Sequence, residues 1–284
     1  MGARQRSAIN WPPLEEEERR GSATVRLYRP VFQTGKHLGR ALIREILAPY
    51  RETKLSILWA LLTPVVPITA YAFLKIFLNA FPSSDGIDPA VYIAVGVTLW
   101  FWMRDIVFSG VNGLNRNKTM LAQSRFPLIN TILIAQGNVI FEASIRIVFT
   151  MGLIAVFSSW SFAGILAAGV MMFVMAVMSH GIGLVLAVVC ASSPDFKNLS
   201  DIVFRYAFFV SNVLFPLPKN DWTIWLYWLN PFAIAIDNTR YLIVYGEPKS
   251  WIEISALVVL ALLVFMAGSR LFYFAKDQIR ETLI

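Results

Sequence analysis

The chain has 284 residues, of which 57% are hydrophobic and 15% are charged, whereas soluble domains carry about 25% charged residues. Together with a mean hydropathy of +0.59, this composition excludes a soluble domain and indicates an integral membrane protein. The formal net charge of +7 is then expected to follow the positive-inside rule, which removes the main reason to consider binding to nucleic acid.

The first 54 residues are expected to stay in the cytoplasm, because they are rich in Lys and Arg and contain no apolar stretch long enough for a signal peptide. Residues 1–35 include a run of glutamates followed by two arginines, which indicates a flexible cytoplasmic tail. Over residues 36–54, apolar side chains recur at helical spacing, and Arg40, Arg44 and Arg51 take other positions. This pattern predicts an amphipathic interface helix that lies on the membrane surface.

Six stretches are apolar over the roughly 20 residues that a membrane-spanning helix needs. They cover residues 55–78, 91–113, 128–157, 161–191, 201–217 and 251–274. The predicted fold is therefore an all-α integral membrane protein with a six-span domain over residues 55–284. An even number of spans places both termini on one side, and the basic residues of 114–127 and of the tail after Arg270 place that side in the cytoplasm.

Residues 218–250 are too polar to span the membrane and too apolar for an ordinary loop. Aromatic residues crowd positions 222–228, and Asn230-Pro231 separates them from a second apolar piece. We expect a pair of short re-entrant helices on the periplasmic side, with indole rings at the level of the lipid headgroups. An interfacial loop with a belt of aromatic residues is the alternative.

The sequence contains no pattern that is typical of a catalytic, cofactor-binding or metal site. The two histidines, His37 and His180, have no carboxylate or cysteine at ligand or triad spacing, and Cys190 is the single cysteine. Gly35-Lys36 is not a phosphate-binding loop, because Pro30 stands at the position of its first glycine. We expect that the chain alone hydrolyses no nucleotide, and that His180 is a hydrogen-bonded residue of helix packing.

Charged residues inside the predicted spans are costly in hydrocarbon and therefore mark candidate functional positions. Glu142 and Arg146 lie four residues apart and are expected to neutralise each other on one helix face. Arg104 and Asp105 are adjacent and point to different faces, so at least one of them must find a partner on another helix or face water. This second pair is the better candidate for a transport pathway.

Three segments resemble the membrane subunit of ABC exporters for polysaccharides. The first, "YRETKLSILWALLTPVVPITAYAFLKIF" (50–77), matches the motif that opens the first span in that family at Tyr50, Arg51, Leu55, Trp59, Ala60, Leu61 and Pro64. The second, "SPDFKNLSDIVFRYAFFVSNVLFPL" (193–217), is similar to the turn before the fifth span and that span, but has Pro194-Asp195 where the family has an Arg-Asp pair. The third, "NPFAIAIDNTRYLIVYG" (230–246), resembles the Asn-Pro element before the last span.

The resemblance implies a homodimer of this chain with two copies of a cytoplasmic ATPase subunit, which would bind the ATP and Mg; this chain would bind no cofactor. It also implies that the loop 114–127 carries a coupling helix seated in a cleft of the ATPase. Asn115 or Asn117 can cap such a helix, and Pro127 ends it. The residues expected to make the contact are Arg116, Lys118, Met120, Leu121, Arg125 and Phe126. A basic anchoring loop is the alternative.

In the family the first, second and fifth spans line the channel, which here points to Tyr71, Trp100, Trp102, Arg104, Asp105, Tyr206, Phe208 and Phe209. Aromatic faces stack on sugar rings without strict directionality, so they suit a channel for a long glycan; roles in packing or lipid contact are the alternative.

The function implied is export of a lipid-linked polysaccharide, such as O-antigen or capsule, across the bacterial inner membrane. An ABC permease for a drug, lipid or other small molecule is the first alternative, and a carrier or channel that works alone is the second.

Overall fold

The computed structural model describes residues 21–52, 62, 65–66, 68–70, 73–74, 86–123, 126–193, 195–217 and 221–283. All regular elements in these residues are α-helices. They are α1 (Ala23–Gln33), α2 (Gly35–Glu52), α4 (Pro89–Arg116), α5 (Lys118–Gln123), α6 (Leu128–Phe157), α7 (Phe162–Ser192), α8 (Asp195–Val210), α9 (Asp221–Leu229), α10 (Pro231–Tyr245) and α11 (Trp251–Leu283).

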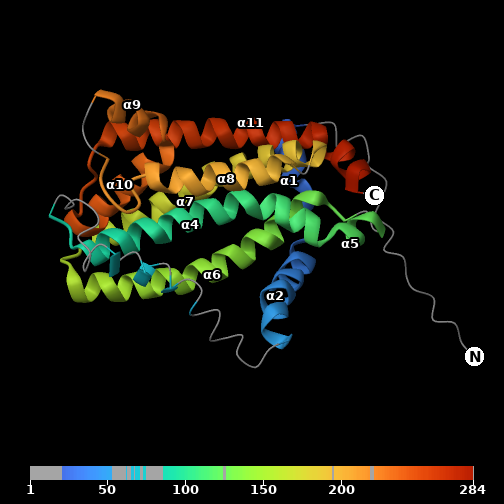
Figure 1. Cartoon of the computed structure of the whole chain (residues 1–284). Coiled ribbons are helices and arrows are strands. Elements are labelled where there is room, and N and C mark those ends of the chain that lie inside the picture. The colour runs from blue at the N-terminus through green and yellow to red at the C-terminus, as the bar shows by residue number, and fades with distance from the viewer. Residues whose placement is uncertain are drawn as a thin grey trace, which may run out of the picture.

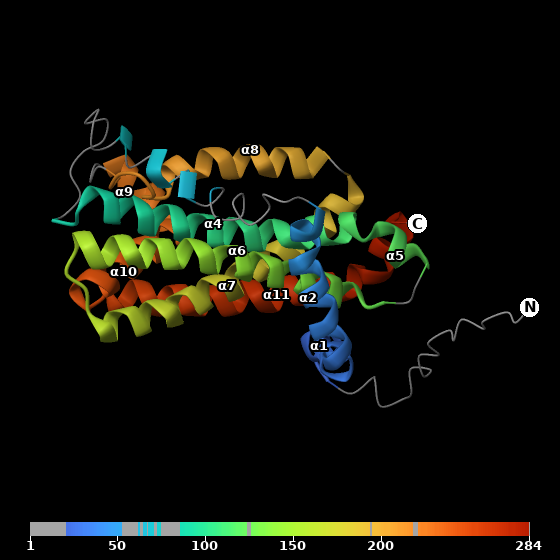
Figure 2. The same ribbon diagram turned by 90° about the horizontal axis from the view of Figure 1, so that it is seen from below.

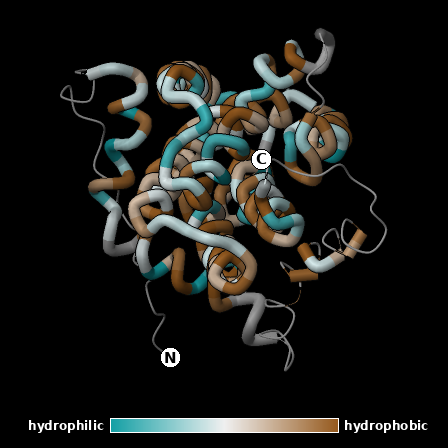
Figure 3. Tube along the Cα trace, turned by 90° about the vertical axis from the view of Figure 1, so that its left-hand side faces the viewer, coloured by the Kyte–Doolittle hydropathy of each residue, from teal (hydrophilic) through white to brown (hydrophobic). Residues whose placement is uncertain are grey.

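The long helices run side by side as one bundle (Figure 1). Helices α1, α2 and α5 gather at the end of the bundle where α11 finishes, and α9 and α10 lie at the opposite end (Figures 1 and 2). Figure 3, which looks along the bundle, shows apolar residues on its outer surface as well as inside it. An apolar exterior is expected where lipid tails surround the helices.

Four helices are long and apolar enough to cross a membrane: α4, α6, α7 and α11. They coincide with four of the six predicted spans, with ends that differ by a few residues except at the C-terminal end of α11, which runs on to Leu283. The predicted first span, 55–78, falls mostly outside the described residues. The total of six therefore stays a prediction, while the all-helical, multi-pass architecture is confirmed.

The predicted fifth span, 201–217, has different bounds in the structure. Helix α8 begins at Asp195 and ends at Val210, after which Asn212 has a left-handed backbone with φ of 54°. Its 16 residues give a helix of about 24 Å, which is shorter than a hydrocarbon core of about 30 Å. Apolar composition alone could not locate this end, because the carbonyl groups freed there are bound by side chains from a distant segment.

Two short helices, α9 and α10, occupy the region 218–250, where a pair of short re-entrant helices is expected. Their entry into the membrane stays a prediction. Asn230 separates them and caps α10, since its Oδ1 accepts hydrogen bonds from the backbone N–H groups of Phe232 and Ala233 at 3.1 and 3.3 Å. Pro231 occupies the first turn of α10, where its missing N–H costs nothing. The polar break in the sequence thus divides the region as predicted.

Helix α1 lies inside the segment predicted as a flexible tail. Ser22 caps it by accepting a hydrogen bond from the backbone N–H of Val25, and Leu27 is buried against the bundle. Pro30 lies inside this helix, where proline is normally unfavourable, and the packing partners of the helix come mainly from α11 and α6. Its presence therefore depends on tertiary contacts that the local sequence does not reveal.

Small residues allow α7 and α11 to approach each other closely. A Cβ atom built at Gly181 of α7 would lie 2.7 Å from the Cα atom of Phe265, and one at Gly268 would meet the backbone of Gly181. Glycine is therefore required at these two positions for the helices to pack, as is common between membrane helices.

Replacing Gly181 with leucine is expected to destabilise the bundle by about 1–3 kcal/mol, because the side chain must push the α11 backbone away. Gly169 is the matched control in the same helix, since a Cβ atom there meets nothing within 4 Å. The measurement is the thermal unfolding of both purified variants in detergent. Equal stability of the Gly181→Leu and Gly169→Leu variants would show that the close approach is not needed.

Candidate functional site

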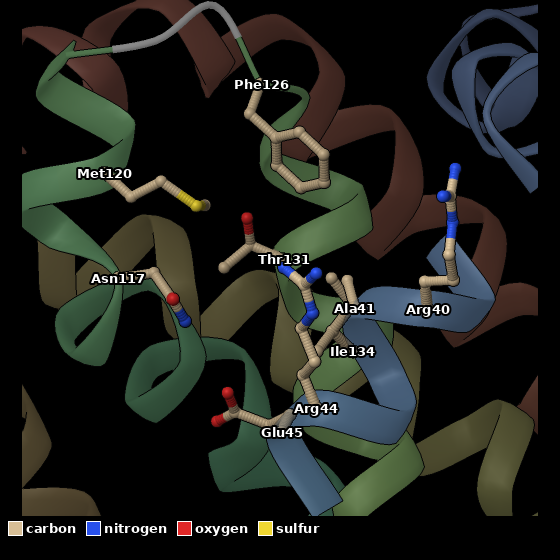
Figure 4. Close-up of a pocket in the computed structure, with 9 residues that line it drawn as sticks. All are labelled: Arg40, Ala41, Arg44, Glu45, Asn117, Met120, Phe126, Thr131 and Ile134. Carbon is tan, nitrogen blue, oxygen red and sulfur yellow. The ribbon is translucent and has the colours of Figure 1, made fainter. Parts of the chain in front are cut away.

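A cleft of about 580 Å³ opens between α2, α5 and the start of α6, at the end of the bundle that carries α1 and α5. We call it the end cleft, and its lining residues are Arg40, Ala41, Arg44, Glu45, Asn117, Met120, Phe126, Thr131 and Ile134. Figure 4 shows Met120 and Phe126 on one side of the cleft and the α2 side chains on the other. The cleft thus combines an apolar wall with a charged wall.

The short helix α5 is held in place from three directions. The side-chain amide of Asn117 donates to the carbonyl of Gly113 at 3.0 Å, which ends α4 and turns the chain. Leu121 is 1% exposed and packs in a cluster with Phe272 of α11. Arg280 of α11 donates to the carbonyl of Phe126 at 2.7 Å. A force applied to α5 would therefore reach α4 and α11 directly.

The residues predicted to form the coupling surface do not all face outward. Met120 is 40% exposed and Lys118 is exposed, and both are accessible to a partner protein. Leu121 is instead buried, so its predicted place on the contact surface is corrected to a core position. Arg116 is exposed and lies 3.9 Å from Glu45 of α2, whereas Arg125 falls outside the described residues.

Helix α2 forms the other wall of the end cleft and matches the predicted interface helix of 36–54 within two residues. It packs tightly on α6, where a Cβ atom at Gly137 would collide with the side chain of Leu42. Arg40 and Arg44 remain exposed along its outer side. One side of α2 thus packs on the bundle, while the apolar residues Ile43 and Leu47 stay exposed. Its predicted place on the membrane surface stays a prediction.

Helix α1 is tied into the bundle by hydrogen bonds. The hydroxyl of Tyr28 lies 2.6 Å from Nε2 of His180 in α7, and Nδ1 of His180 lies 2.9 Å from Oε1 of Gln136 in α6. Burial raises the pKa of Tyr28 to about 12, so its hydroxyl stays protonated at neutral pH and can donate to Nε2. Asn130 of α6 donates to the hydroxyl of Thr34 at 2.7 Å. His180 has the hydrogen-bonded packing role expected from the sequence.

A second polar region lies within the bundle, between α4, α6 and α8. Asp105 accepts from Arg146 at 2.9 Å, and Arg104 lies 3.5 Å from both Asp105 and Asp201. The expected pairing of Glu142 with Arg146 is wrong, because Arg146 reaches across to α4 and Glu142 accepts from the amide of Asn138 instead. Spacing along one helix could not show that a neighbouring helix supplies a closer carboxylate.

These charged groups border a cavity of about 220 Å³, which we call the charged cavity. Its charged lining residues are Arg104, Asp105, Arg116, Glu142, Lys197 and Asp201. The side chain of Arg146 is 7% exposed, whereas that of Arg104 is 34% exposed. The pair of buried Arg146 and half-buried Asp105 therefore fixes α6 to α4, while Arg104 and Asp201 border open space next to α8.

Several residues predicted to line a channel are part of the interior packing instead. Trp100 is 2% exposed and makes edge contacts with Phe208 and Phe232 at 5.9 and 5.8 Å between ring centroids. The indole N–H of Trp102 donates to the carbonyl of Met172 at 3.1 Å. In this conformation these two tryptophans and Phe208 are thus buried packing residues, and their predicted role in the channel stays a prediction.

Two of the predicted aromatic residues remain accessible. Tyr206 and Phe209 are exposed on α8, three residues apart and on the same face. Tyr71 falls outside the described residues.

Arg240 of α10, which is 1% exposed, was not among the residues predicted from the sequence. Its guanidinium donates to the carbonyls of Tyr92, Asn212 and Val213 at 3.1, 2.6 and 2.7 Å and lies 3.6 Å from the ring centroid of Tyr92. It therefore joins α10 to α4 and to the end of α8. An arginine within an apolar segment must find partners, and that signal was present in the sequence.

The four membrane-length helices of the bundle are those of a multi-pass membrane protein. Residues 37–244 match the model of the ABC-2 type transporter family, so the chain belongs to this family.

Two curated relatives align with most of the chain. It is 20% identical to the O-antigen export system permease protein RfbA of Myxococcus xanthus, over 91% of this chain and 100% of that protein. It is 24% identical to the polysialic acid transport protein KpsM of Escherichia coli, over 86% of this chain and 95% of that protein.

Proposed function

We propose that the chain is the transmembrane subunit of an ABC transporter that exports a lipid-linked polysaccharide across the bacterial inner membrane, driven by a separate ATPase subunit. The observation that carries this proposal is the family match over residues 37–244 together with nearly full-length similarity to two proteins named for O-antigen export and polysialic acid transport. The membrane-length helices of the bundle agree with it.

The end that carries the end cleft faces the cytoplasm in this proposal. Exposed basic residues gather there, including Arg40, Arg44, Arg116 and Lys118, as the positive-inside rule requires. Helices α9 and α10 then lie on the periplasmic side. The exposed rings of Trp225 and Trp228 suit a position at the headgroups of the outer leaflet, where indole rings are enriched.

The ATPase would dock at the end cleft, with Met120 as an apolar contact and Arg40 and Arg44 beside it. Movement of α5 would reach α11 through Leu121. The bond from Arg280 to the carbonyl of Phe126 ties the residues before α6 to the same helix. Nucleotide-driven closure of two ATPase subunits would then shift the spans as near-rigid bodies.

The polysaccharide path would lie beside α8, between two copies of the chain. Tyr206 and Phe209 face outward from α8 and offer aromatic faces to sugar rings. Arg104 of α4 and Asp201 of α8 border the charged cavity, which is also next to this helix. The proposal includes a homodimer, in which the face of α8 that carries Tyr206 and Phe209 borders the path.

The test is to co-express the chain with its ATPase partner and to reconstitute the purified complex in proteoliposomes. We expect lipid-linked polysaccharide from the source bacterium to stimulate ATP hydrolysis and to appear inside inverted vesicles. Stimulation by a panel of drugs or by free lipids, with none by the polysaccharide, would support a small-molecule exporter and reject the proposed substrate class.

A further inference from the structure

A second cleft, of about 610 Å³, lies between the first turns of α1 and the outer side of α11. The charged side chains among its described lining residues are Arg26 of α1 and Arg270 of α11, so the charge at its mouth is positive. Met266, Tyr273 and Phe274 supply an apolar and aromatic wall. We call it the α1–α11 cleft, and it is separate from both the end cleft and the charged cavity.

The position of the cleft along α11 corresponds to the surface of the bilayer. Trp251 is exposed at the start of this helix, and the helix rises about 33 Å from there to Tyr273. That distance matches a hydrocarbon core of about 30 Å. Tyr273 and the two arginines therefore lie near the headgroups of one leaflet, which is the cytoplasmic leaflet in the proposed orientation.

The wall of the cleft continues into surface that suits acyl chains. Met266 and Phe274 are exposed, and Leu263 and Leu262 extend the apolar surface of α11 toward the middle of the bilayer. Val25 of α1 is also exposed near the first turn. A ligand that fits this arrangement has an anionic head for the arginines and long apolar chains for α11.

We propose that the α1–α11 cleft binds an anionic phospholipid of the cytoplasmic leaflet. Arg26 and Arg270 bind its phosphate, because guanidinium groups form charge-assisted hydrogen bonds to phosphate oxygens. The acyl chains lie along α11. Since α1 also contacts His180 through Tyr28, the bound lipid strengthens the attachment of α1 to the membrane-spanning core. This binding is independent of the exported substrate and does not require the proposed export function.

Native mass spectrometry of the full-length chain in detergent tests the proposal by titration with phosphatidylglycerol and with phosphatidylcholine of identical acyl chains. We expect phosphatidylglycerol to bind more tightly to the unmodified chain. The variant Arg26→Gln/Arg270→Gln should bind it on the order of thirty-fold more weakly, from about 1 kcal/mol for each arginine. The variant Arg29→Gln/Arg205→Gln removes two arginines outside the cleft and should bind within about twofold of the unmodified chain.

The conservative variant Arg26→Lys/Arg270→Lys should keep a preference for phosphatidylglycerol, which distinguishes lost charge from lost fold. Glycerol 1-phosphate, which lacks acyl chains, should not displace the lipid at equal concentration, because the apolar wall contributes to binding. Equal binding of the two phospholipids, an equal loss in the Arg29→Gln/Arg205→Gln control, or full displacement by glycerol 1-phosphate would each overturn the proposal.

Discussion

Replacing Arg240 with methionine is expected to lower the free energy of unfolding by several kcal/mol, more than any other single substitution proposed for this chain. Three carbonyl groups, of Tyr92, Asn212 and Val213, accept hydrogen bonds from its guanidinium. The carbonyl of Val213 loses this partner in the variant, and a buried unsatisfied acceptor costs about 1–3 kcal/mol. The carbonyl of Asn212 keeps the Tyr92 hydroxyl at 3.3 Å, so its loss is smaller. The end of α8 then loses its attachment to α10 and α4, and export should fall with it.

The stability of Arg240→Lys should lie between those of the unmodified chain and Arg240→Met. An ammonium group keeps the charge, but it cannot reach three carbonyls as a planar guanidinium does. Arg205→Met is the matched control, since Arg205 is an exposed arginine of the neighbouring helix α8. Thermal unfolding of the purified variants in detergent gives the comparison, and wild-type stability of Arg240→Met would show that the end of α8 is held by other contacts.

The second large effect is expected at the ion pair of the half-buried Asp105 and the buried Arg146. Asp105→Leu leaves the guanidinium of Arg146 buried without its carboxylate and should cost about 3–5 kcal/mol. Arg146→Met should destabilise the chain less than Asp105→Leu, because Asp105 keeps Arg104 as a partner at 3.5 Å. The double variant Asp105→Leu/Arg146→Met should recover much of the lost stability, because two apolar side chains need no ionic or hydrogen-bonding partner in the membrane.

Variants of this pair can also distinguish a role in stability from a role in transport. If the charged cavity belongs to the substrate path, the stable double variant should still export less polysaccharide than the unmodified chain. The measurements are thermal unfolding and surface polysaccharide for the two single variants and the double variant. A double variant no more stable than Asp105→Leu would mean that the two side chains do not stabilise each other, whatever their distance.

The sequence was most informative where a property depends on long runs of residues. Four membrane-length helices follow directly from apolar composition, because every spanning segment must satisfy its own backbone groups in lipid. The break between α9 and α10 was predictable from Asn230-Pro231, since capping and the missing N–H of proline act locally.

Properties that depend on pairs of distant residues were not predictable. Arg146 has a carboxylate four residues away on its own helix, yet it binds Asp105 of α4. Trp100 lies in an apolar run like those of the other spans, but rings from α8 and α10 cover it. Leu121 and Met120 are neighbours with opposite exposure, which only the packing of α5 on α11 decides. A single sequence carries no direct record of such contacts.

Docking of the ATPase at the end cleft is tested most directly by co-purification of the ATPase with the Met120→Asp variant. Met120 lines the cleft and is exposed, so aspartate should leave the fold intact while placing a charge in a desolvated interface, at a cost of several kcal/mol. Leu121→Asp cannot serve this purpose, because Leu121 is buried and its loss would damage the bundle itself.

Ala122→Asp is the matched control, as Ala122 is exposed on the same short helix but does not line the cleft. Each variant is purified from membranes through a tag on this chain, and the bound ATPase is quantified against membrane level and thermal stability. We expect roughly a tenfold or greater loss of ATPase with Met120→Asp, near-normal retention with Ala122→Asp, and unchanged stability for both. Full retention of the ATPase by Met120→Asp, or an equal loss in both variants, would contradict docking at this cleft.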